Sequence, residues 1–299
     1  MAKAKNSNRI GHSLSDKVFL AVVWFLLMII FILFAYPILY VLIASFSTRV
    51  NLALIPESFS MLGYQAVFNY KAIWTGYVNS LFYAVLGTAI SLALTIACAY
   101  PLSRRDMPGS NFIMGLFVFT MYFSGGLIPT YLVVRDLKLL NTIWAVILPG
   151  SLSVYNMIVM RTYFQNQIPD ELLEASQLDG CTNMNFLIRI CLPLSMPIIA
   201  VIGLYYAVAY WNSYFSAMIY LQSRHLYPLQ IFLREILILN TMDLTEQMSM
   251  DPEIVAQLEA RANVMKYALI VVASVPVMAI YPLVQRHFVK GVMIGAVKG

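Results

Sequence analysis

Long uncharged stretches set the pattern of this chain. No Asp, Glu, Lys or Arg interrupts six of them, at residues 18–48, 72–103, 107–134, 139–160, 190–223 and 267–285. At 1.5 Å per residue, a helix over each stretch is long enough to cross a hydrocarbon core about 30 Å thick. Because lipid offers the backbone no hydrogen-bonding partner, a helix is the conformation expected for each run. The pattern therefore predicts six membrane-spanning helices and no strands.

Composition supports a membrane protein. Hydrophobic residues make up 61% and charged residues 11% of the 299 residues, whereas a soluble domain carries about 25% charged residues. We therefore predict an all-α integral membrane protein whose transmembrane domain spans residues 18–285, between an N-terminal segment 1–17 and a tail 286–299. Two longer polar connections interrupt this domain, the inner connection at residues 161–189 and the outer connection at residues 224–266.

The distribution of charge predicts the orientation. The side that holds both termini and the inner connection carries 11 of the 19 basic residues and 6 of the 14 acidic ones, against 8 and 8 on the other side. Lys and Arg favour cytoplasmic connections, so both termini and the inner connection are predicted to be cytoplasmic.

The sequence also excludes several activities. It has no Gly-Lys-Ser/Thr phosphate loop and no His-Glu pair at metalloprotease spacing, and no charged residue lies within a predicted span. A membrane enzyme or an ion-coupled carrier acting alone would need such groups. We therefore predict that the chain binds no cofactor itself, and that a partner supplies any energy it uses.

The inner connection carries the local signals of two short helices. Pro169 suits a first helical turn, and the acidic residues after it suit the positive end of a helix. Gly180 is placed to end this helix in a left-handed conformation. Thr182 or Asn183 can cap a second helix, and Pro193 then opens the fifth span. The residues alone leave a docking element and an ordinary solvated loop equally open.

The same segment resembles the cytoplasmic signature of importer permeases of the ATP-binding cassette class. In that signature Glu-Ala-Ala is followed by three residues, a Gly, nine residues and Ile-x-Leu-Pro. Here "EASQLDG" begins at Glu174, with Ser176 in place of the second Ala, and "ICLP" begins at Ile190 at the expected distance.

Two further stretches narrow the resemblance. "IPTYLVVRDLKLLNTIWAVILPG" from Ile128 and "QRHFVKGVMIGAVKG" from Gln285 are similar to the inner subunit of maltose-type permeases, in the branch that serves complex oligosaccharides. This resemblance implies a type I importer permease fold and sugar import across a bacterial cytoplasmic membrane. It also implies a second homologous permease subunit, two cytoplasmic ATPase subunits that bind ATP and magnesium, and an extracytoplasmic sugar-binding protein. A cargo other than sugar stays open.

The resemblance implies two contact regions. A coupling helix seated in an ATPase cleft would present Glu174, Ala175, Ser176, Asp179 and Gly180. The outer connection would meet the binding protein through Asp243, Glu246, Asp251 and Glu253, and a solvated connector is the alternative. The basic tail after residue 290 either reaches the ATPases or serves as a positive anchor.

The fifth hydrophobic run contains a candidate sugar path. Tyr206 and Tyr210 are four residues apart and therefore share a helix face. Flat aromatic rings suit the C–H faces of sugars, and an amide can bond sugar hydroxyls. The candidate path residues are Tyr206, Tyr210, Trp211, Asn212 and Tyr214. Packing against neighbouring helices or placement at the lipid interface is the alternative.

Two more local patterns carry predictions. The sequence "FSGG" at residues 123–126 indicates either a loosened third span or close helix packing. The start of the outer connection has an apolar stripe at helical spacing from Leu226 to Leu237. This stripe predicts a helix that lies along the membrane face or against the partner permease.

Overall fold

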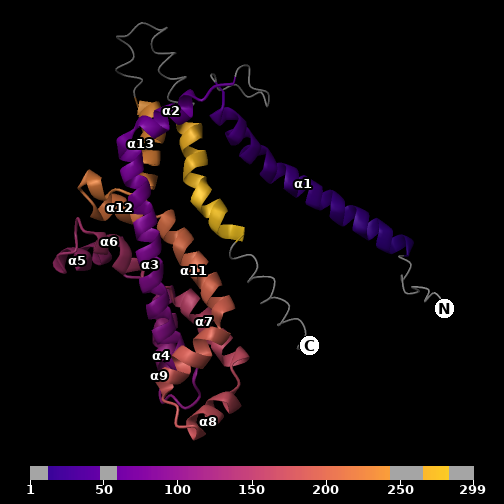
Figure 1. The fold of residues 1–299 in the computed structure, drawn as a ribbon, viewed down its shortest axis with the longest axis vertical. Coiled ribbons are helices and arrows are strands. Elements are labelled where there is room, and N and C mark those ends of the chain that lie inside the picture. Colours follow the sequence, from indigo (N-terminus) through magenta and orange to yellow (C-terminus); the bar gives the residue numbers. More distant parts are fainter. Residues whose placement is uncertain (1–12, 48–58, 243–264, 283–299) are drawn as a thin grey trace.

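The computed structural model of the chain describes residues 13–47, 59–242 and 265–282. Figure 1 shows an elongated helical bundle around α3 (Lys71–Ser103), from which α1 (Leu14–Ser45) leaves at an angle. Across the described ranges, every regular element is a helix or a helical turn, and an isolated bridge joins Ser47 to Phe59. The prediction of an all-α fold is confirmed.

Helical segments occur at all six predicted spans: three are continuous helices long and apolar enough to cross a membrane, and three are pairs bent at a short break. Continuous helices form the first, second and sixth: α1, α3 and the helix Met265–Pro282. The others are bent pairs: α4 (Ser110–Tyr122) with α5 (Leu127–Asp136) at 112°, Ile143–Gly150 with α7 (Val154–Gln167) at 52°, and Asn183–Leu194 with α11 (Met196–Trp211) at 82°. The remaining elements are α2 (Leu62–Asn69), α6 (Ile143–Ile147), η1 (Leu148–Gly150), α8 (Asp170–Leu178), α9 (Asn183–Phe186), η2 (Leu187–Cys191), α10 (Leu192–Leu194), α12 (Phe215–Tyr220), η3 (Arg224–Leu226) and α13 (Leu229–Met242).

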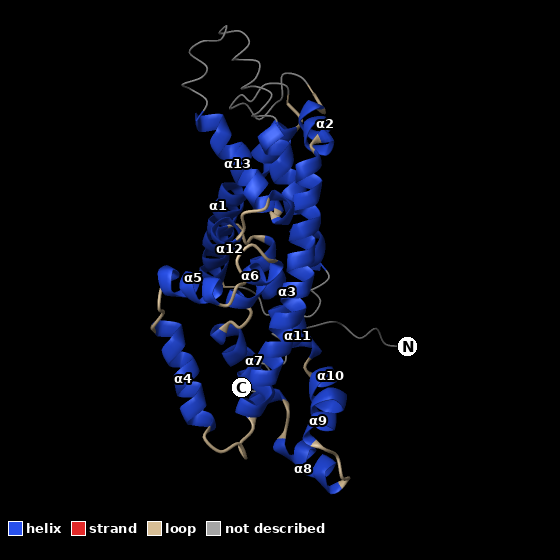
Figure 2. Cartoon of the chain, turned by 90° about the vertical axis from the view of Figure 1, so that its left-hand side faces the viewer, coloured by secondary structure: helices blue, strands red, loops and turns tan. Residues whose placement is uncertain are grey.

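The third span breaks at the "FSGG" stretch. Gly126, the residue before α5, has a φ of +85°, which glycine adopts readily and other residues avoid. A Cβ atom at this position would meet no heavy atom within 4 Å, so close helix packing does not explain the glycine. Figure 2 shows α5 lying across the direction of α4. Of the two interpretations, the loosened span is confirmed.

Small residues on α3 let two other helices approach its backbone. A Cβ atom on Gly76 would lie 2.6 Å from the ring of Phe232 on α13, and one on Gly87 would lie 2.7 Å from the ring of Tyr210 on α11. Small residues at such contacts are typical of helix pairs in membranes. The core of the protein therefore lies along α3.

The helix predicted at the start of the outer connection is present as α13, but its partner was predicted wrongly. Leu229 and Phe232 are almost fully buried, and the backbone N–H of Leu229 donates to Ser80 Oγ of α3 at 2.9 Å. The same apolar cluster includes Leu269 of the helix Met265–Pro282. The part of the stripe from Leu229 to Ile236 thus packs inside its own chain, because glycine and serine on α3 leave room for it.

Candidate functional site

The inner connection folds as the predicted pair of short helices. α8 begins at Asp170, directly after Pro169, and ends before Gly180, whose φ of +74° makes the left-handed turn. Thr182 precedes α9, and its Oγ1 accepts the backbone N–H of Asn185 at 3.3 Å. These helices lie at the end of the bundle opposite α2 and α13 (Figures 1 and 2). The predicted bend and cap are therefore confirmed.

Four of the five residues predicted to contact an ATPase lie on the surface of this pair: Glu174, Ala175, Asp179 and Gly180. Ser176 differs from them, since it is buried and its Oγ donates to the carbonyl of Leu173 at 2.7 Å. A small side chain at position 176 is thus explained by its place on the buried face of α8.

An exposed leucine at the end of α8 was missed in the sequence. Leu178 is 90% exposed, while Leu172 and Leu173 of the same helix face the core. Met184 on α9 is also exposed, at 63%. A single exposed apolar side chain is common on protein surfaces, but here two lie on consecutive short helices. The usable signal was an apolar residue outside the inward-facing stripe, directly before the Asp-Gly turn.

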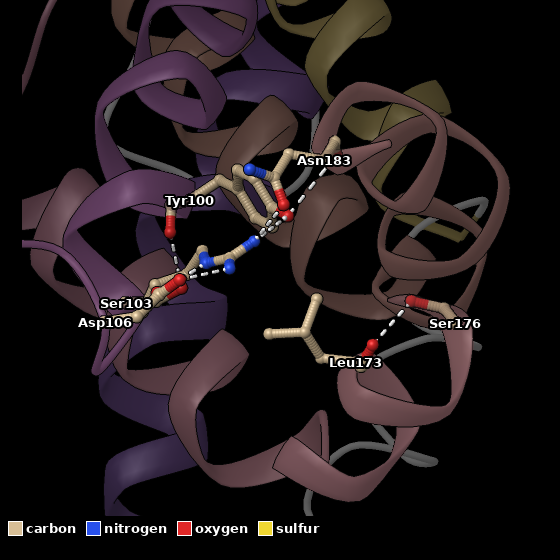
Figure 3. Close-up of polar contacts among 7 residues, drawn as sticks. Tyr100, Ser103, Asp106, Leu173, Ser176 and Asn183 are labelled. Carbon is tan, nitrogen blue, oxygen red and sulfur yellow. Dashed lines mark hydrogen bonds and ion pairs between the residues drawn. The ribbon is translucent and has the colours of Figure 1, made fainter. Parts of the chain in front are cut away.

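The sequence also gave no indication of how the helix pair is held to the bundle. Arg104, which follows α3 directly, donates from Nη1 to Asn183 Oδ1 at 2.7 Å and to the Tyr100 hydroxyl at 3.2 Å. Its Nε donates to Asp106 Oδ1 at 2.8 Å. Figure 3 shows this network, with Asp106 on one side and Asn183 on the other. The end of α3 is therefore bound to the start of α9.

Burial and charge both strengthen this network. The side chain of Arg104 is 11% exposed, and its hydrogen bond with Asp106 raises the pKa of the guanidinium. The Arg104 bond in turn lowers the pKa of the Asp106 carboxyl. Both groups therefore stay charged at neutral pH, and the hydrogen bonds gain strength from that charge.

A cavity of about 590 Å³ opens beside the helix pair. Basic residues from the end of α3 and acidic residues from α8 line it, including Arg104, Arg105, Asp170 and Glu174. Two of these lining residues, Arg105 and Asp170, form an ion pair at 3.1 Å. The cavity has mixed charge and lies where an inserted side chain would touch both α3 and α8.

The five candidate path residues separate into two groups. Tyr206, Tyr210 and Trp211 are buried at 3–5% exposure, and all three make hydrogen bonds inside the protein. Asn212 and Tyr214 are exposed. In this conformation, the three buried side chains are occupied by protein partners, which leaves the two exposed ones available to a ligand.

Asn212 lines a second cavity, of about 380 Å³, between α11, α13 and the helix Met265–Pro282. Gln230 and Ser274 add polar groups to its otherwise apolar wall. One helical turn beyond Gln230, the guanidinium of Arg234 lies 5.6 Å from the centre of the Tyr214 ring. Amides, a hydroxyl, an aromatic ring and a guanidinium thus occur close together on this face, and each can bind saccharide groups.

Other predicted contacts lie outside the described residues. These are the binding-protein contacts Asp243, Glu246, Asp251 and Glu253, and the basic tail 286–299. Among the residues that the structure does describe, no group of three or more His, Cys, Asp or Glu side chains is arranged to hold a metal ion.

Six apolar helical segments, three of them bent pairs, and a pair of short helices at one end define a multi-pass membrane permease. Residues 89–294 match the family described as "Binding-protein-dependent transport system inner membrane component". This match covers more than half of the chain, and the chain belongs to that family. It is therefore a membrane-embedded transport subunit that works with other subunits, as the sequence resemblance implied.

Similarity to individual relatives extends over most of the chain. The polygalacturonan/rhamnogalacturonan transport system permease protein YtcP of Bacillus subtilis is 40% identical over 96% of this chain and 100% of its own. Protein LplC of the same organism is 41% identical over 88% of this chain and 89% of its own. A crystal structure of a bacterial ABC transporter involved in the import of the acidic polysaccharide alginate contains a similar chain. The two superpose with a TM-score of 0.82 at 31% identity, covering 93% of this chain and 99% of the other.

Proposed function

We propose that this chain is one permease subunit of an ATP-driven importer that takes up oligosaccharides delivered by a binding protein. The observation that carries this proposal is similarity along nearly the full chain to a saccharide transport permease, at 40% identity. On this proposal the chain forms half of the translocation path, and a second homologous permease subunit forms the other half. Partner ATPases bind ATP and magnesium, and this chain contributes no catalytic group.

The helix pair of the inner connection supports a coupling role. α8 is largely exposed and ends at the Gly180 turn, and Leu178 and Met184 offer apolar contacts beside the charged Glu174 and Asp179. Its position at the end of the bundle suits docking in a cleft of an ATPase. The chain runs from α8 through α9, η2 and α10 directly into α11. Movement of a docked α8 would therefore be passed to a spanning helix as a rigid-body displacement.

The surface of α1 supports a second membrane subunit. None of its most apolar 18-residue window is buried within the described chain, and α1 leaves the bundle at an angle (Figure 1). Lipid alone could cover an apolar helix, but a helix that diverges from its own bundle leaves room for a neighbouring one. We therefore place the second permease between α1 and the bundle.

The cargo side is proposed to begin at the cavity beside Asn212. The relatives named above include one for polygalacturonan and rhamnogalacturonan and one for the acidic polysaccharide alginate, so an oligosaccharide with acidic units fits best. Arg234 over the Tyr214 ring suits a carboxylated sugar, since guanidinium binds carboxylate and an aromatic ring contacts C–H faces. On this proposal the outer connection meets the binding protein, and both termini lie in the cytoplasm.

A reconstituted importer tests the coupling proposal. Gly180→Val should strain the left-handed turn, because a β-branched residue tolerates positive φ poorly. Gly109→Val is the matched control: Gly109 has a φ of +75°, and a Cβ atom there, as at Gly180, would meet no heavy atom within 4 Å. Uptake should be lost with Gly180→Val and with Glu174→Lys, and retained with Gly109→Val. Equal uptake in all three variants would show that the helix pair has no coupling role.

A second measurement tests the cargo. Cells that lack this permease should lose growth on oligosaccharides with uronic acid units and keep growth on neutral ones. Loss on a peptide source instead would indicate an importer of the same class with another cargo. Normal uptake by the isolated chain, without ATPases, would indicate an ion-coupled carrier.

A further inference from the structure

Two buried tyrosines of α11 bind the backbone at the break of the fourth span. This span bends by 52° between residues 143–150 and α7. The hydroxyl of Tyr210 donates to the carbonyl of Ile147 at 3.0 Å, just before the bend. The backbone N–H of Ser153, the residue that caps the start of α7, donates to the hydroxyl of Tyr206 at 3.0 Å. Both sides of the break are thus joined to one neighbouring helix.

The direction of the hydrogen bonds extends the contact to α3. A tyrosine hydroxyl has one proton, and the carbonyl of Ile147 can only accept, so Tyr210 gives its proton there. Ser91 of α3, whose Oγ lies 2.9 Å from the same hydroxyl, must then be the donor. Thr95, one turn further along α3, bonds the hydroxyl of Tyr206 at 2.7 Å.

These contacts are shielded from solvent. Ser91 and Thr95 have no exposed surface, and the two tyrosines are at most 5% exposed. Gly87 lets the Tyr210 ring lie against α3, since a Cβ atom there would be 2.7 Å from three ring atoms. In a dry interior an unpaired backbone group is costly. The tyrosines therefore fix where the break lies relative to α11 and α3.

Their position on α11 suggests what this connection does. α11 is the first long helix after the inner connection, which the proposed function couples to the ATPases. We propose that Tyr206 and Tyr210 are positioning residues of the transport cycle, which hold the break of the fourth span to α11 so that movement of the inner connection reaches it. This inference rests on the proposed function and deepens it, because it names the contact that carries movement into the membrane.

The test uses the complete importer with its ATPases in lipid vesicles. Tyr206→Phe and Tyr210→Phe remove one oxygen atom each and leave the ring in place. Tyr205→Phe is the matched control, since Tyr205 is on the same helix and 46% exposed. We expect uptake per ATP hydrolysed to fall about 5- to 100-fold in the two buried variants, the usual range of coupling between sites. The control should keep the wild-type ratio.

A structural role alone would give a different result. It would lower uptake and ATP hydrolysis together, in proportion to the complex that remains assembled, and that outcome would overturn the proposal. Ser91→Ala provides a milder second variant, since it removes the donor to Tyr210 and leaves the bond to Ile147. It should lower the ratio less than Tyr210→Phe does. Wild-type ratios in all three variants would also overturn the proposal.

Distance measurements between spin labels separate this inference from the proposed function. In a cysteine-free background, the distance between labels at Tyr155 on α7 and Met196 on α11 reports how the break is held to α11. The distance between labels at Gln177 and Met196 reports the position of α8 relative to α11. ATP trapping should move Gln177 in every variant. The 155–196 distance should keep one narrow distribution in the wild type and broaden in the Tyr→Phe variants. If Gln177 does not move, the coupling role is refuted. If Gln177 moves but the 155–196 distance distribution is unchanged in the Tyr→Phe variants, only the positioning role is refuted.

Discussion

Replacing Arg104 by alanine should loosen the helix pair of the inner connection from the bundle. The change removes the hydrogen bonds from its guanidinium to Asn183 and Tyr100, and it leaves Asp106 without its partner. A hydrogen bond from a charged group contributes about 1.5–3 kcal/mol. The Asp106 carboxylate is 63% exposed, so its ion pair adds no more than about 1 kcal/mol. Of these interactions, only the bond to Asn183 reaches α9, so its loss shifts the local opening equilibrium of α9 by about 1.5–3 kcal/mol, a factor of roughly 10 to 100.

Hydrogen exchange of the purified permease measures this opening. Peptides covering α9 should exchange faster in Arg104→Ala by up to that factor, while peptides from the middle of α3 keep their protection, because local opening is independent of global unfolding. Arg104→Lys should fall between the two, since an ammonium keeps the charge but cannot form the same set of bonds.

Arg105→Ala is the matched control. Arg105 is the next residue, its side chain is 87% exposed, and its ion pair with Asp170 lies at the surface. Its loss should change the exchange of α9 by less than about 1 kcal/mol. If both alanine variants exchange alike, the buried network does not hold α9, and the reasoning from burial fails.

Three further outcomes are expected. Leu178→Asp should weaken copurification of the ATPases by about 10- to 100-fold, the value of one buried leucine, and unchanged copurification would remove Leu178 from the docking surface. Gly76→Ala should lower the stability of the permease by about 1–3 kcal/mol through overpacking against α13. Gly115→Ala is the control and should not lower it, since a Cβ atom there meets no heavy atom within 4 Å. Equal stabilities of the two variants would contradict the close approach of α13. Because Arg104 lowers the pKa of Asp106, the stabilisation from their ion pair is fully present above about pH 4, the ordinary pKa of Asp. It is lost as the pH falls through the lower pKa of Asp106 in the folded protein. Hydrogen exchange of α9, corrected for the intrinsic exchange rate, should therefore be constant between about pH 6 and 8.

Hydropathy located the six apolar segments because it reports which residues can lie in lipid. It does not report the direction of the backbone, so two of the three breaks were not predicted. The break before Gly126 had a local signal, since glycine makes a positive φ inexpensive. The break near Ser153 depends on tyrosines more than 50 residues away that bind its backbone, and no local pattern reveals them. The aromatic pair was visible in the sequence, but whether its hydroxyls face a sugar or a backbone is decided by packing.

The inner connection was predicted well because its signals are local. Pro169, Gly180 and Thr182 act through their own backbone or through a residue three positions away. The Arg104–Asn183 bond, by contrast, joins residues 79 positions apart. From the sequence, Arg104 was used only as one of the basic residues that predict the cytoplasmic side, and no contact was predicted for it. The same limit explains why α13 was found as a helix and assigned to the wrong partner.

Two sets of contacts fasten α3 to α9 and α11. Near the proposed cytoplasmic end, Arg104 holds α9, and within the bundle Ser91 and Thr95 hold α11 through its tyrosines. A displacement of α8 that moved α11 alone would have to break hydrogen bonds at both places, and those to α11 are buried. Moving α3 and α11 together breaks neither set. We therefore expect the transport movement to be a rocking of this helix pair, with bending confined to the break at residues 123–126, for which the structure gives no hydrogen bond to α3 among the described residues.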